Sequence, residues 1–271
     1  MADGADVLRR IVSERREDAR QAGRLVAEAE LRERASLRRH RSLRAALARH
    51  QGPAVIAEMK QASPSAGRLV DTYDPAGIAR AYEAAGAVGL SVLTEPRHFL
   101  GDLHHLELVR DVVALPILRK DFICDAYQVA EAAAWGSDVV LLIVAGLTPE
   151  ELVTLYRTAT EVFGLDVLVE AHTEAELTAA LRLDDAIIGI NSRDLRTLST
   201  DLAVAHRLAS LVGEERLSIA ESGIKTGRHL AALGDAGYDG FLIGESLLRG
   251  GDPGGALARL LADAAREERQ P

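Results

Sequence analysis

Eight short apolar runs follow one another after Gly52-Pro53, and stretches with a helical pattern separate them. The runs are nearly continuous in apolar character and do not alternate with polar residues. Strands buried on both faces have this composition, which indicates a parallel sheet covered by helices. The runs are AVIAEM from Ala54, VGLSVL from Val88, LPIL from Leu115, DVVLLIV from Asp138, DVLVE from Asp166, AIIGI from Ala186, RLSIA from Arg216 and DGFLIG from Asp239.

The stretches between these runs resemble capped helices. DPAGIARAYEAAG and TPEELVTLYRTATEVFG, for example, open with Asp or Thr and close with Gly. Eight strand–helix units in about 215 residues predict an α/β fold of the closed (β/α)8 type, a TIM barrel. A doubly wound open sheet is the alternative, but the GxGxxG fingerprint typical of its first strand is missing.

The first fifty residues differ from the rest. Residues 4–50 carry no strand pattern and predict two or three helices. We therefore expect residues 1–271 to form a single (β/α)8 barrel domain with residues 1–50 as an N-terminal helical extension. This stretch holds 13 Arg against 8 Asp plus Glu, but the two signs are interleaved. That arrangement favours a solvated amphipathic face over a polyanion-binding arm.

Composition narrows the classes of function. The formal net charge of −9 gives no support for binding to nucleic acid or to an anionic membrane. A single cysteine, Cys124, excludes an internal disulfide and a cysteine-based metal cluster. The N-terminus lacks a signal-peptide pattern, and the longest apolar run, VVLLIVAGL from Val139, is far shorter than the roughly 20 residues of a membrane span. We expect a soluble, cytoplasmic protein.

Charged and polar residues stand where the predicted strands end. The active site of such a barrel is built from the carboxyl ends of the strands and the loops that follow. Seven of the eight runs end in such residues, and the fourth ends in apolar ones. The seven sets are Glu58 and Lys60, Thr94 and Glu95, Arg119 to Asp121, Glu170 and His172, Asn191 and Arg193, Glu221 and Ser222, and Gly244 and Glu245.

Almost every cationic side chain in the sequence is arginine. Lysine occurs only three times, at Lys60, Lys120 and Lys225. Lys60 and Lys120 fall at the ends of predicted strands, and Lys225 is expected to begin the helix after the seventh. An arginine stays protonated, whereas the pKa of a lysine moves readily with its surroundings. Chance survival of three surface lysines is the alternative, but the placement of Lys60 and Lys120 favours a catalytic role.

Glycines follow the seventh and eighth runs in ESGI and IGES. Barrels often hold a phosphate between these two loops, where backbone N–H groups at helix N-termini face the anion. Each glycine alone indicates only a tight turn. Together, Ser222, Gly223, Gly244 and Glu245 favour a phosphorylated small-molecule substrate.

Two other kinds of site receive little support. His104 and His105 are adjacent, so they face different sides of a helix, and no His/Asp/Glu spacing indicates a metal site. Ser222 has no evident His–Asp partners, which argues against a serine hydrolase.

Seven ordered blocks make the chain resemble the indole-3-glycerol phosphate synthase family over almost its whole length. The opening VLRRIVSERREDA is also similar to that family's N-terminal helix. The blocks are IAEMKQASPSAG from Ile56, LTEPRHFLGDLHHL from Leu93, LPILRKDFICDAYQVAEAAAWGSDVVLLI from Leu115, LVEAHTEAEL from Leu168, IIGINSRDL from Ile187, AESGI from Ala220 and GFLIGESLL from Gly240.

The resemblance implies a carbon–carbon lyase of tryptophan biosynthesis. Its substrate would be 1-(2-carboxyphenylamino)-1-deoxyribulose 5-phosphate, and its products indole-3-glycerol phosphate, carbon dioxide and water. No cofactor and no metal are implied. Lys120 would be the general acid in ring closure, and Glu170 the acid–base partner in the later dehydration.

The resemblance also assigns supporting roles. Glu58 and Glu221 would hold the cations, and Asn191 would hydrogen-bond the intermediate. Lys60 would face the anionic groups of the substrate, and Ser63 and Arg193 would contact its carboxylate. The phosphate would lie against backbone groups near Ser222, Gly223, Gly244 and Glu245.

Four positions depart from the family's usual residues, and VEAH replaces VEVH. None is the expected acid or base, so the departures bear on substrate affinity more than on chemistry. They are Gln61 and Ala66 in place of basic residues, Ser192 in place of Asn, and His98 in place of an aromatic residue.

Two other functions remain as alternatives. Another phosphosugar barrel enzyme, such as a phosphoribosylanthranilate isomerase, also needs an acid and a base, but Glu58-x-Lys60 and the Arg-Lys-Asp triplet at 119–121 argue against it. A catalytically silent paralogue that binds phosphate would have lost one or more of these polar residues. Both a monomer and a weak association with other tryptophan-pathway enzymes are compatible with the sequence.

Overall fold

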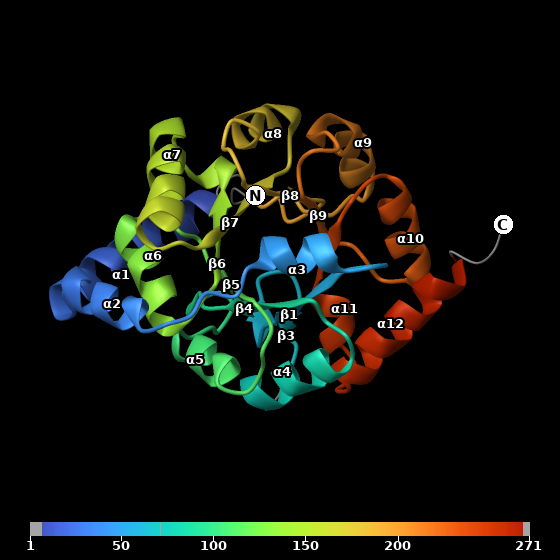
Figure 1. The fold of residues 1–271 in the computed structure, drawn as a ribbon, viewed down its shortest axis with the longest axis horizontal. Coiled ribbons are helices and arrows are strands. Elements are labelled where there is room, and N and C mark those ends of the chain that lie inside the picture. The colour runs from blue at the N-terminus through green and yellow to red at the C-terminus, as the bar shows by residue number, and fades with distance from the viewer. Residues whose placement is uncertain (1–6, 71, 268–271) are drawn as a thin grey trace, which may run out of the picture.

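A closed barrel of eight parallel strands forms the centre of the computed structural model, which describes residues 7–70 and 72–267 (Figure 1). The strands neighbour one another in the order β1-β10-β9-β8-β7-β6-β5-β4, and β4 closes onto β1. The predicted (β/α)8 TIM barrel is therefore confirmed. The strands are β1 (Val55–Met59), β4 (Gly89–Leu93), β5 (Ile117–Lys120), β6 (Val139–Ile143), β7 (Asp166–Ala171), β8 (Ile187–Asn191), β9 (Ser218–Glu221) and β10 (Gly240–Ile243).

Helices cover the outside of the barrel. Asp125, Thr148 and Thr173 each form a capping box at the start of a helix, as the Asp and Thr residues in the sequence indicate. The helices are α4 (Pro75–Ala84), α5 (His104–Arg110), α6 (Ala126–Trp135), α7 (Pro149–Arg157), α8 (Glu174–Ala180), α9 (Ala203–Val212), α10 (Gly227–Asp235), the short α11 (Glu245–Leu248) and α12 (Pro253–Glu267).

Three helices precede the first strand: α1 (Val7–Leu25), α2 (Glu28–Ser36) and α3 (Leu43–Arg49). In Figure 1, α3 lies in front of the strands. Its buried Leu43 and Leu47 approach Gly89 and Gly240 at the amino ends of β4 and β10. Helix α3 therefore covers the end of the barrel where the strands begin, which is its lower end; the strands finish at its upper end. Leu8 of α1 instead packs with residues from the upper half of the interior.

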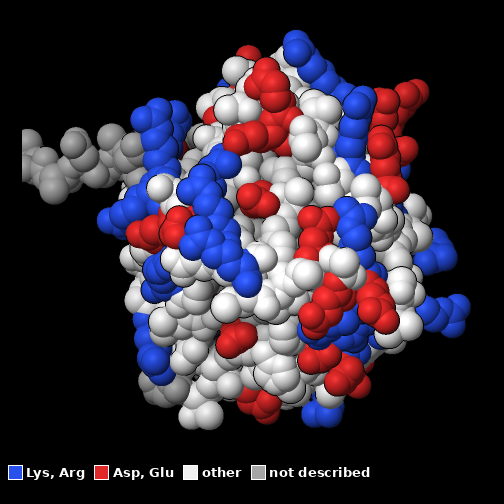
Figure 2. All heavy atoms as spheres, turned by 90° about the vertical axis from the view of Figure 1, so that its left-hand side faces the viewer, with Lys and Arg blue, Asp and Glu red and all other residues white. Residues whose placement is uncertain are grey.

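The face that carries α1 and α2 is rich in charge, and both signs are interspersed on it (Figure 2). Arg32 pairs with Glu28 at 2.6 Å, and Arg38 of the segment after α2 pairs with Glu107 at 2.8 Å. These contacts fit the expected solvated face. No helix among the described residues is long and apolar enough to cross a membrane.

Two hydrophobic layers hold the barrel. The inner layer fills the barrel itself with residues such as Ile56, Leu168 and Ile219, and the outer layer lies between the strands and the surrounding helices. A small hairpin of β2 (Ala62–Ser63) and β3 (Gly67–Arg68) follows β1. The sequence does not predict this hairpin.

Candidate active site

The alternation of side chains along each strand decides which charged residues enter the barrel. Successive side chains point to opposite faces, so a residue two places after an interior one faces the same way. At the carboxyl end of a strand, this step leads from an apolar interior residue to a polar one above it. The pairs are Ile56 and Glu58, Leu118 and Lys120, Leu168 and Glu170, and Ile219 and Glu221.

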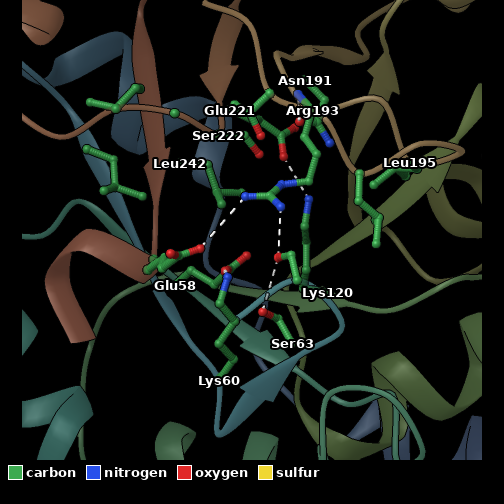
Figure 3. Close-up of a pocket in the computed structure, with 18 of the residues that line it drawn as sticks. Glu58, Lys60, Ser63, Lys120, Asn191, Arg193, Leu195, Glu221, Ser222 and Leu242 are labelled. Atoms are coloured by element: carbon green, nitrogen blue, oxygen red, sulfur yellow. Dashed lines mark hydrogen bonds and ion pairs between the residues drawn. The ribbon is translucent and has the colours of Figure 1, made fainter. Parts of the chain in front are cut away.

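These polar residues line a cavity of about 890 Å³ at the upper end of the barrel (Figure 3). The volume suits a small-molecule ligand. Every residue to which the sequence analysis assigns a role in catalysis or substrate binding lines this one cavity. They are Glu58, Lys60, Ser63, Lys120, Glu170, Asn191, Arg193, Glu221, Ser222, Gly223, Gly244 and Glu245.

Lys120 lies between two carboxylates. Its Nζ is 2.9 Å from Glu170 Oε2 and 2.7 Å from Glu221 Oε2. Burial lowers the pKa of the ammonium, but the charges of Glu170 and Glu58 and the hydrogen bond with Glu221 outweigh it and raise that pKa above its usual value. Lys120 is therefore an ammonium ion at neutral pH and carries the proton that a general acid needs.

Glu221 holds its proton unusually well. Burial raises the pKa of its carboxyl group to about 8, and the nearby Glu170 charge adds to this effect against the opposing effect of Lys120. Its Oε1 has no hydrogen-bond partner among the described residues. A Cβ atom at Gly189 would lie 2.3 Å from this oxygen, so only glycine leaves room for the carboxyl group.

Asn191 orients the other carboxylate of the pair. Its Nδ2 donates to Glu170 Oε1 at 2.9 Å, while its Oδ1 accepts from the backbone N–H of Arg193 at 2.9 Å. The second contact fixes which end of the amide faces Glu170. Glu170 is therefore held by Asn191 on one oxygen and by Lys120 on the other.

Glu58 and Lys60 form a second ion pair on the β1 side of the cavity. Burial raises the pKa of Glu58, but the charges of Lys60 and Lys120 reverse the shift and lower that pKa. Gly244 leaves room for this carboxylate, because a Cβ atom there would lie 2.4 Å from Glu58 Oε1. Lys60 is thereby fixed at the cavity wall.

Arg193 reaches across the cavity (Figure 3). Its Nη1 donates to Ser65 Oγ at 2.8 Å, and its Nη2 is 3.7 Å from Glu245 Oε2. The β2–β3 hairpin brings Ser63 and Ser65 to this side, with their hydroxyl oxygens 3.5 Å apart. A guanidinium and two hydroxyl groups together can bind a carboxylate.

The loops after β9 and β10 meet at one end of the cavity. Ser222 and Gly223 both have positive φ, 67° and 81°, which turns the chain sharply after β9. The Ser246 hydroxyl donates to the Ile224 carbonyl at 3.0 Å and ties the two loops together. These are the loops in which ESGI and IGES predict a phosphate cradle.

One expectation about these loops is wrong. We expect helices to begin directly after both strands, but only α11 does, at Glu245. α10 begins at Gly227 with Thr226 as its N-cap, because the Thr226 hydroxyl accepts from the His229 N–H. Lys225 therefore lies in the loop before the helix.

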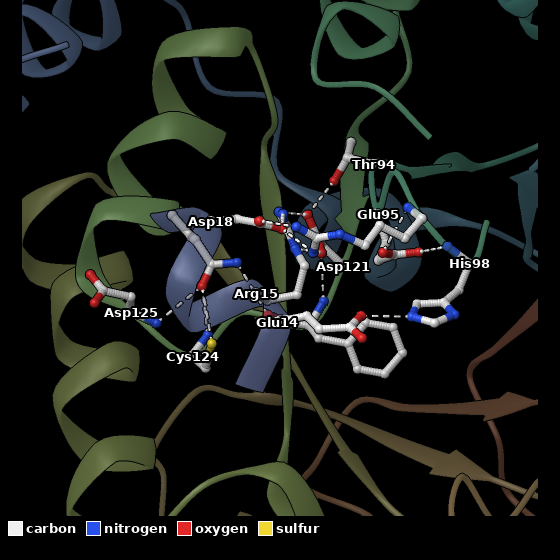
Figure 4. Close-up of polar contacts among 12 residues, drawn as sticks. Glu14, Arg15, Asp18, Thr94, Glu95, His98, Asp121, Cys124 and Asp125 are labelled. Carbon is white, nitrogen blue, oxygen red and sulfur yellow. Dashed lines mark hydrogen bonds and ion pairs between the residues drawn. The ribbon is translucent and has the colours of Figure 1, made fainter. Parts of the chain in front are cut away.

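Arg119 and Asp121, which flank Lys120 in the chain, make their contacts outside the cluster of Lys120, Glu170 and Glu221. Arg119 is fully buried behind the barrel wall, where it pairs with Asp121 at 2.9 Å and with Glu131 of α6. Asp121 also accepts from Thr94 at 2.7 Å and pairs with Arg15 of α1 at 2.8 Å (Figure 4). Of the triplet at 119–121, Lys120 alone contacts Glu170 and Glu221.

Two other strand-end residues are structural. The Glu95 carboxylate accepts from the backbone N–H groups of Arg97, His98 and Phe99 and so holds the loop after β4. The His172 ring donates a hydrogen bond from Nδ1 to the Asn191 carbonyl oxygen at 2.7 Å. Neither lines the main cavity.

The apolar part of the lining was not predicted. Its residues come from interior strand positions and from loops, and a pattern of polar strand ends does not select them. Of this set, Leu141 and Leu242 could be predicted, because side-chain alternation along their strands makes both of them interior residues near strand ends. The set comprises Leu93, Phe99, Phe122, Leu141, Ile143, Leu195, Leu198, Leu202, Ile224, Leu242 and Ile243.

Comparison with known proteins gives consistent matches. The family model described as indole-3-glycerol phosphate synthase matches residues 8–260. A protein of that name from Carboxydothermus hydrogenoformans is 46% identical over 263 residues, which cover 94% of this chain and 99% of that protein. One from Kineococcus radiotolerans is 48% identical over 218 residues, covering 80% of this chain and 79% of that protein.

Solved structures with a similar fold are more distant in sequence. The structure of KGPDC from Streptococcus mutans has a TM-score of 0.63 at 14% identity and covers 80% of this chain and 99% of that one. A structure described as native KDPGal has a TM-score of 0.56 at 17% identity, covering 82% and 97%. At these identities the likeness concerns the barrel fold alone.

Proposed function

The chain belongs to the indole-3-glycerol phosphate synthase family, and we propose how its cavity performs the reaction of that family. It is a carboxy-lyase of tryptophan biosynthesis that converts 1-(2-carboxyphenylamino)-1-deoxyribulose 5-phosphate to indole-3-glycerol phosphate, carbon dioxide and water. The observation that carries the assignment of residues is the position of Lys120 within 2.9 Å of Glu170 and 2.7 Å of Glu221 inside one cavity.

Lys120 is the general acid of ring closure. The aromatic ring carbon bonds to the carbonyl carbon of the sugar chain, the carbonyl π electrons move to oxygen, and that oxygen takes a proton from Lys120. Loss of the carboxylate as carbon dioxide then returns an electron pair to the ring. Glu221, which keeps its proton to about pH 8, stands 2.7 Å away and can restore the proton to Lys120.

Glu170 serves the dehydration that follows. The hydroxyl group made in ring closure leaves as water, and a proton is removed from the neighbouring atom to complete the aromatic indole. Glu170 touches Lys120 through one oxygen and Asn191 through the other, so an acid and a base lie side by side. Asn191 also supplies a hydrogen-bonding group to the intermediate.

The anionic groups of the substrate are held by groups around the rim of the cavity. Ser63 and Arg193 bind the carboxylate, since Arg193 already bonds a hydroxyl oxygen of the same hairpin. Lys60, held by Glu58, faces the substrate's negative charge. The phosphate lies against the cradle formed by backbone N–H groups near Ser222, Gly223, Gly244 and Glu245.

The apolar lining receives the aromatic ring. Phe99 and Phe122, whose ring centroids are 6.1 Å apart, stand beside Leu141 and Leu242 on the cavity wall. A ring packed there is removed from water, and its reacting carbon is held toward the carbonyl group near Lys120.

A direct assay tests the function. Purified protein is mixed with the carboxyphenylamino substrate in buffer containing a chelator, and indole fluorescence is followed. We expect a rise in fluorescence at a rate proportional to enzyme concentration. Absence of product from folded protein would contradict the assigned activity.

Three further expectations from the sequence stay predictions. They are a cytoplasmic location, a monomeric or weakly associating state, and the organisation of residues 1–271 as one barrel domain with residues 1–50 as its extension.

A further inference from the structure

Five Lys and Arg side chains line the cavity, and Lys225 differs from the other four in its charge environment. Lys60 pairs with Glu58, and Lys120 with Glu170 and Glu221. Arg193 and Arg249 both pair with Glu245. Lys225 takes part in no ion pair among residues 7–70 and 72–267, so its positive charge is uncompensated there.

The backbone around Lys225 is held firmly while its side chain stays exposed. Lys225 follows Gly223 by two residues in the loop after β9. The preceding residue, Ile224, is buried and its carbonyl accepts from Ser246. The backbone N–H of Lys225 donates to His229 Nδ1 at 3.3 Å. These contacts anchor an exposed ammonium at the end of the cavity where the cradle lies.

The charges that line the cavity indicate that the Lys225 ammonium attracts an anion. Five carboxylates and the protonated carboxyl group of Glu221 line the cavity beside the five cations. The substrate brings a phosphate and a carboxylate into this space, and the protein as a whole carries a formal charge of −9. An anion gains most from a cation that no neighbouring carboxylate neutralises, and a local cation offsets the repulsion by the net charge. The carboxylates are Glu58, Asp121, Glu170, Asp201 and Glu245.

We propose that Lys225 is a phosphate-directing residue. Its ammonium draws the phosphate of the substrate to the loops after β9 and β10 and completes the backbone cradle with a side-chain charge. It acts in binding and makes no contact with the carbons that react at Lys120. This inference rests on the proposed function, because it assigns a ligand group to one end of the same cavity.

Three variants separate this role from a general effect of charge. Lys225→Gln removes the ammonium, Lys225→Arg keeps a cation, and Arg228→Gln removes an exposed cation three residues along the chain that does not line the cavity. In low-salt buffer we expect Lys225→Gln to raise KM roughly fivefold with kcat unchanged, as suits one exposed cation facing a doubly charged anion. Lys225→Arg and Arg228→Gln should stay within about twofold of wild type.

Salt and inorganic phosphate supply independent readouts. The KM ratio between Lys225→Gln and wild type should shrink toward one as the ionic strength rises to about 1 M, where charges are screened within about 3 Å. Binding of inorganic phosphate, followed by phosphorus NMR without substrate, should weaken in Lys225→Gln and not in Arg228→Gln. Equal phosphate affinity and equal KM in these two variants would overturn the inference.

The two proposals fail in different ways. If wild-type protein makes no indole product but binds phosphate less well after Lys225→Gln, the proposed function fails and the phosphate role of Lys225 stands. If wild type makes product and Lys225→Gln behaves like Arg228→Gln, the function stands and the role of Lys225 fails.

Discussion

At the scale of single residues, the chemistry depends on how three neighbouring groups share their protons. Lys120 gains a raised pKa from the carboxylates around it, and Glu221 keeps its proton because burial opposes its ionisation. Glu170, held by Asn191 and Lys120, completes the set. A site with one ammonium and one protonated carboxyl group at neutral pH is prepared for proton donation.

The raised pKa of Glu221 predicts a pH dependence of stability. A glutamate titrates near 4.5 in the unfolded chain, whereas the pKa of Glu221 in the folded protein is about 8. The bound proton therefore favours the folded state, and this contribution is complete below about pH 4.5 and is lost as the pH rises through about 8.

Glu221→Gln lacks this titration. We expect the free energy of unfolding of wild type, relative to this variant, to fall as the pH rises from about 5 to about 9. Urea unfolding at several pH values measures the difference. Parallel curves over this range would show that Glu221 titrates normally in the folded protein.

Lys60 predicts a loss of affinity rather than of chemistry. Lys60→Ala removes a cation from the rim and leaves Lys120, Glu170 and Glu221 in place. We expect KM for the substrate to rise roughly tenfold, the value of one charged hydrogen bond, with a smaller change in kcat. Steady-state kinetics measures both constants, and an unchanged KM would refute an anion-binding role for Lys60.

Residue-level prediction from sequence succeeded where polar residues end apolar strands. All twelve predicted site residues line one cavity. Side-chain alternation explains this for the five that lie on barrel strands, which are Glu58, Lys120, Glu170, Asn191 and Glu221. The other seven lie in the segments that follow the strands. The same reasoning could not separate Arg119 from Lys120, since which face is interior follows only from the register of the closed barrel. Nor could it find Ser65, whose contact with Arg193 joins two loops far apart in sequence.

At the scale of elements, α1 is connected to the catalytic end of the barrel. Arg15, on α1, forms two hydrogen bonds with the Asp121 carboxylate, at 2.8 and 2.9 Å, next to Lys120 in the chain (Figure 4). Asp18 of the same helix contacts Arg97, and Glu14 contacts His98. The extension thus holds the loops after β4 and β5, and the opening helix stabilises the site from outside.

Removal of this link should destabilise the protein. Arg15→Met keeps an apolar stem of similar length but leaves the buried Asp121 with only Arg119, Thr94 and a backbone N–H as partners. We expect a loss of about 2–3 kcal/mol in the free energy of unfolding. Denaturant unfolding at neutral pH measures the loss.

Arg20→Met on the same helix is the matched control, because Arg20 is exposed and its contact with Glu17 is 3.6 Å. A surface pair at this distance contributes little, so we expect a change below about 1 kcal/mol. Equal losses in the two variants would mean that the Arg15–Asp121 contact adds nothing beyond helix packing.

The sequence predicts those helices and strands that a periodic pattern of apolar residues marks. The strands and the caps of α6, α7 and α8 follow from apolar runs and from Asp and Thr at helix starts. The β2–β3 hairpin did not follow, because strands of two residues show no period. The sequence predicts that α10 begins at Lys225, whereas the helix begins at Gly227, because the His229 N–H donates to the Thr226 hydroxyl and makes Thr226 the cap.

At the scale of the whole molecule, closure of the barrel turns a list of strand ends into one site. β1 pairs with both β4 and β10, so residues from the first and last strands lie beside each other. Glu58 consequently lies against Gly244, although the first and last strands of the barrel are far apart in the sequence. The count of eight strand–helix units predicted this closure, and an open sheet would have left the two ends apart.

The general-acid role of Lys120 is the central claim, and the turnover of Lys120→Arg tests it most directly. Arginine keeps the positive charge between Glu170 and Glu221 but does not release a proton usefully. With substrate at saturation, we expect kcat to fall at least roughly a hundredfold, the lower range for general acid catalysis, while the variant unfolds at the same denaturant concentration as wild type. A kcat close to that of wild type would contradict the account, because another group would then supply the proton.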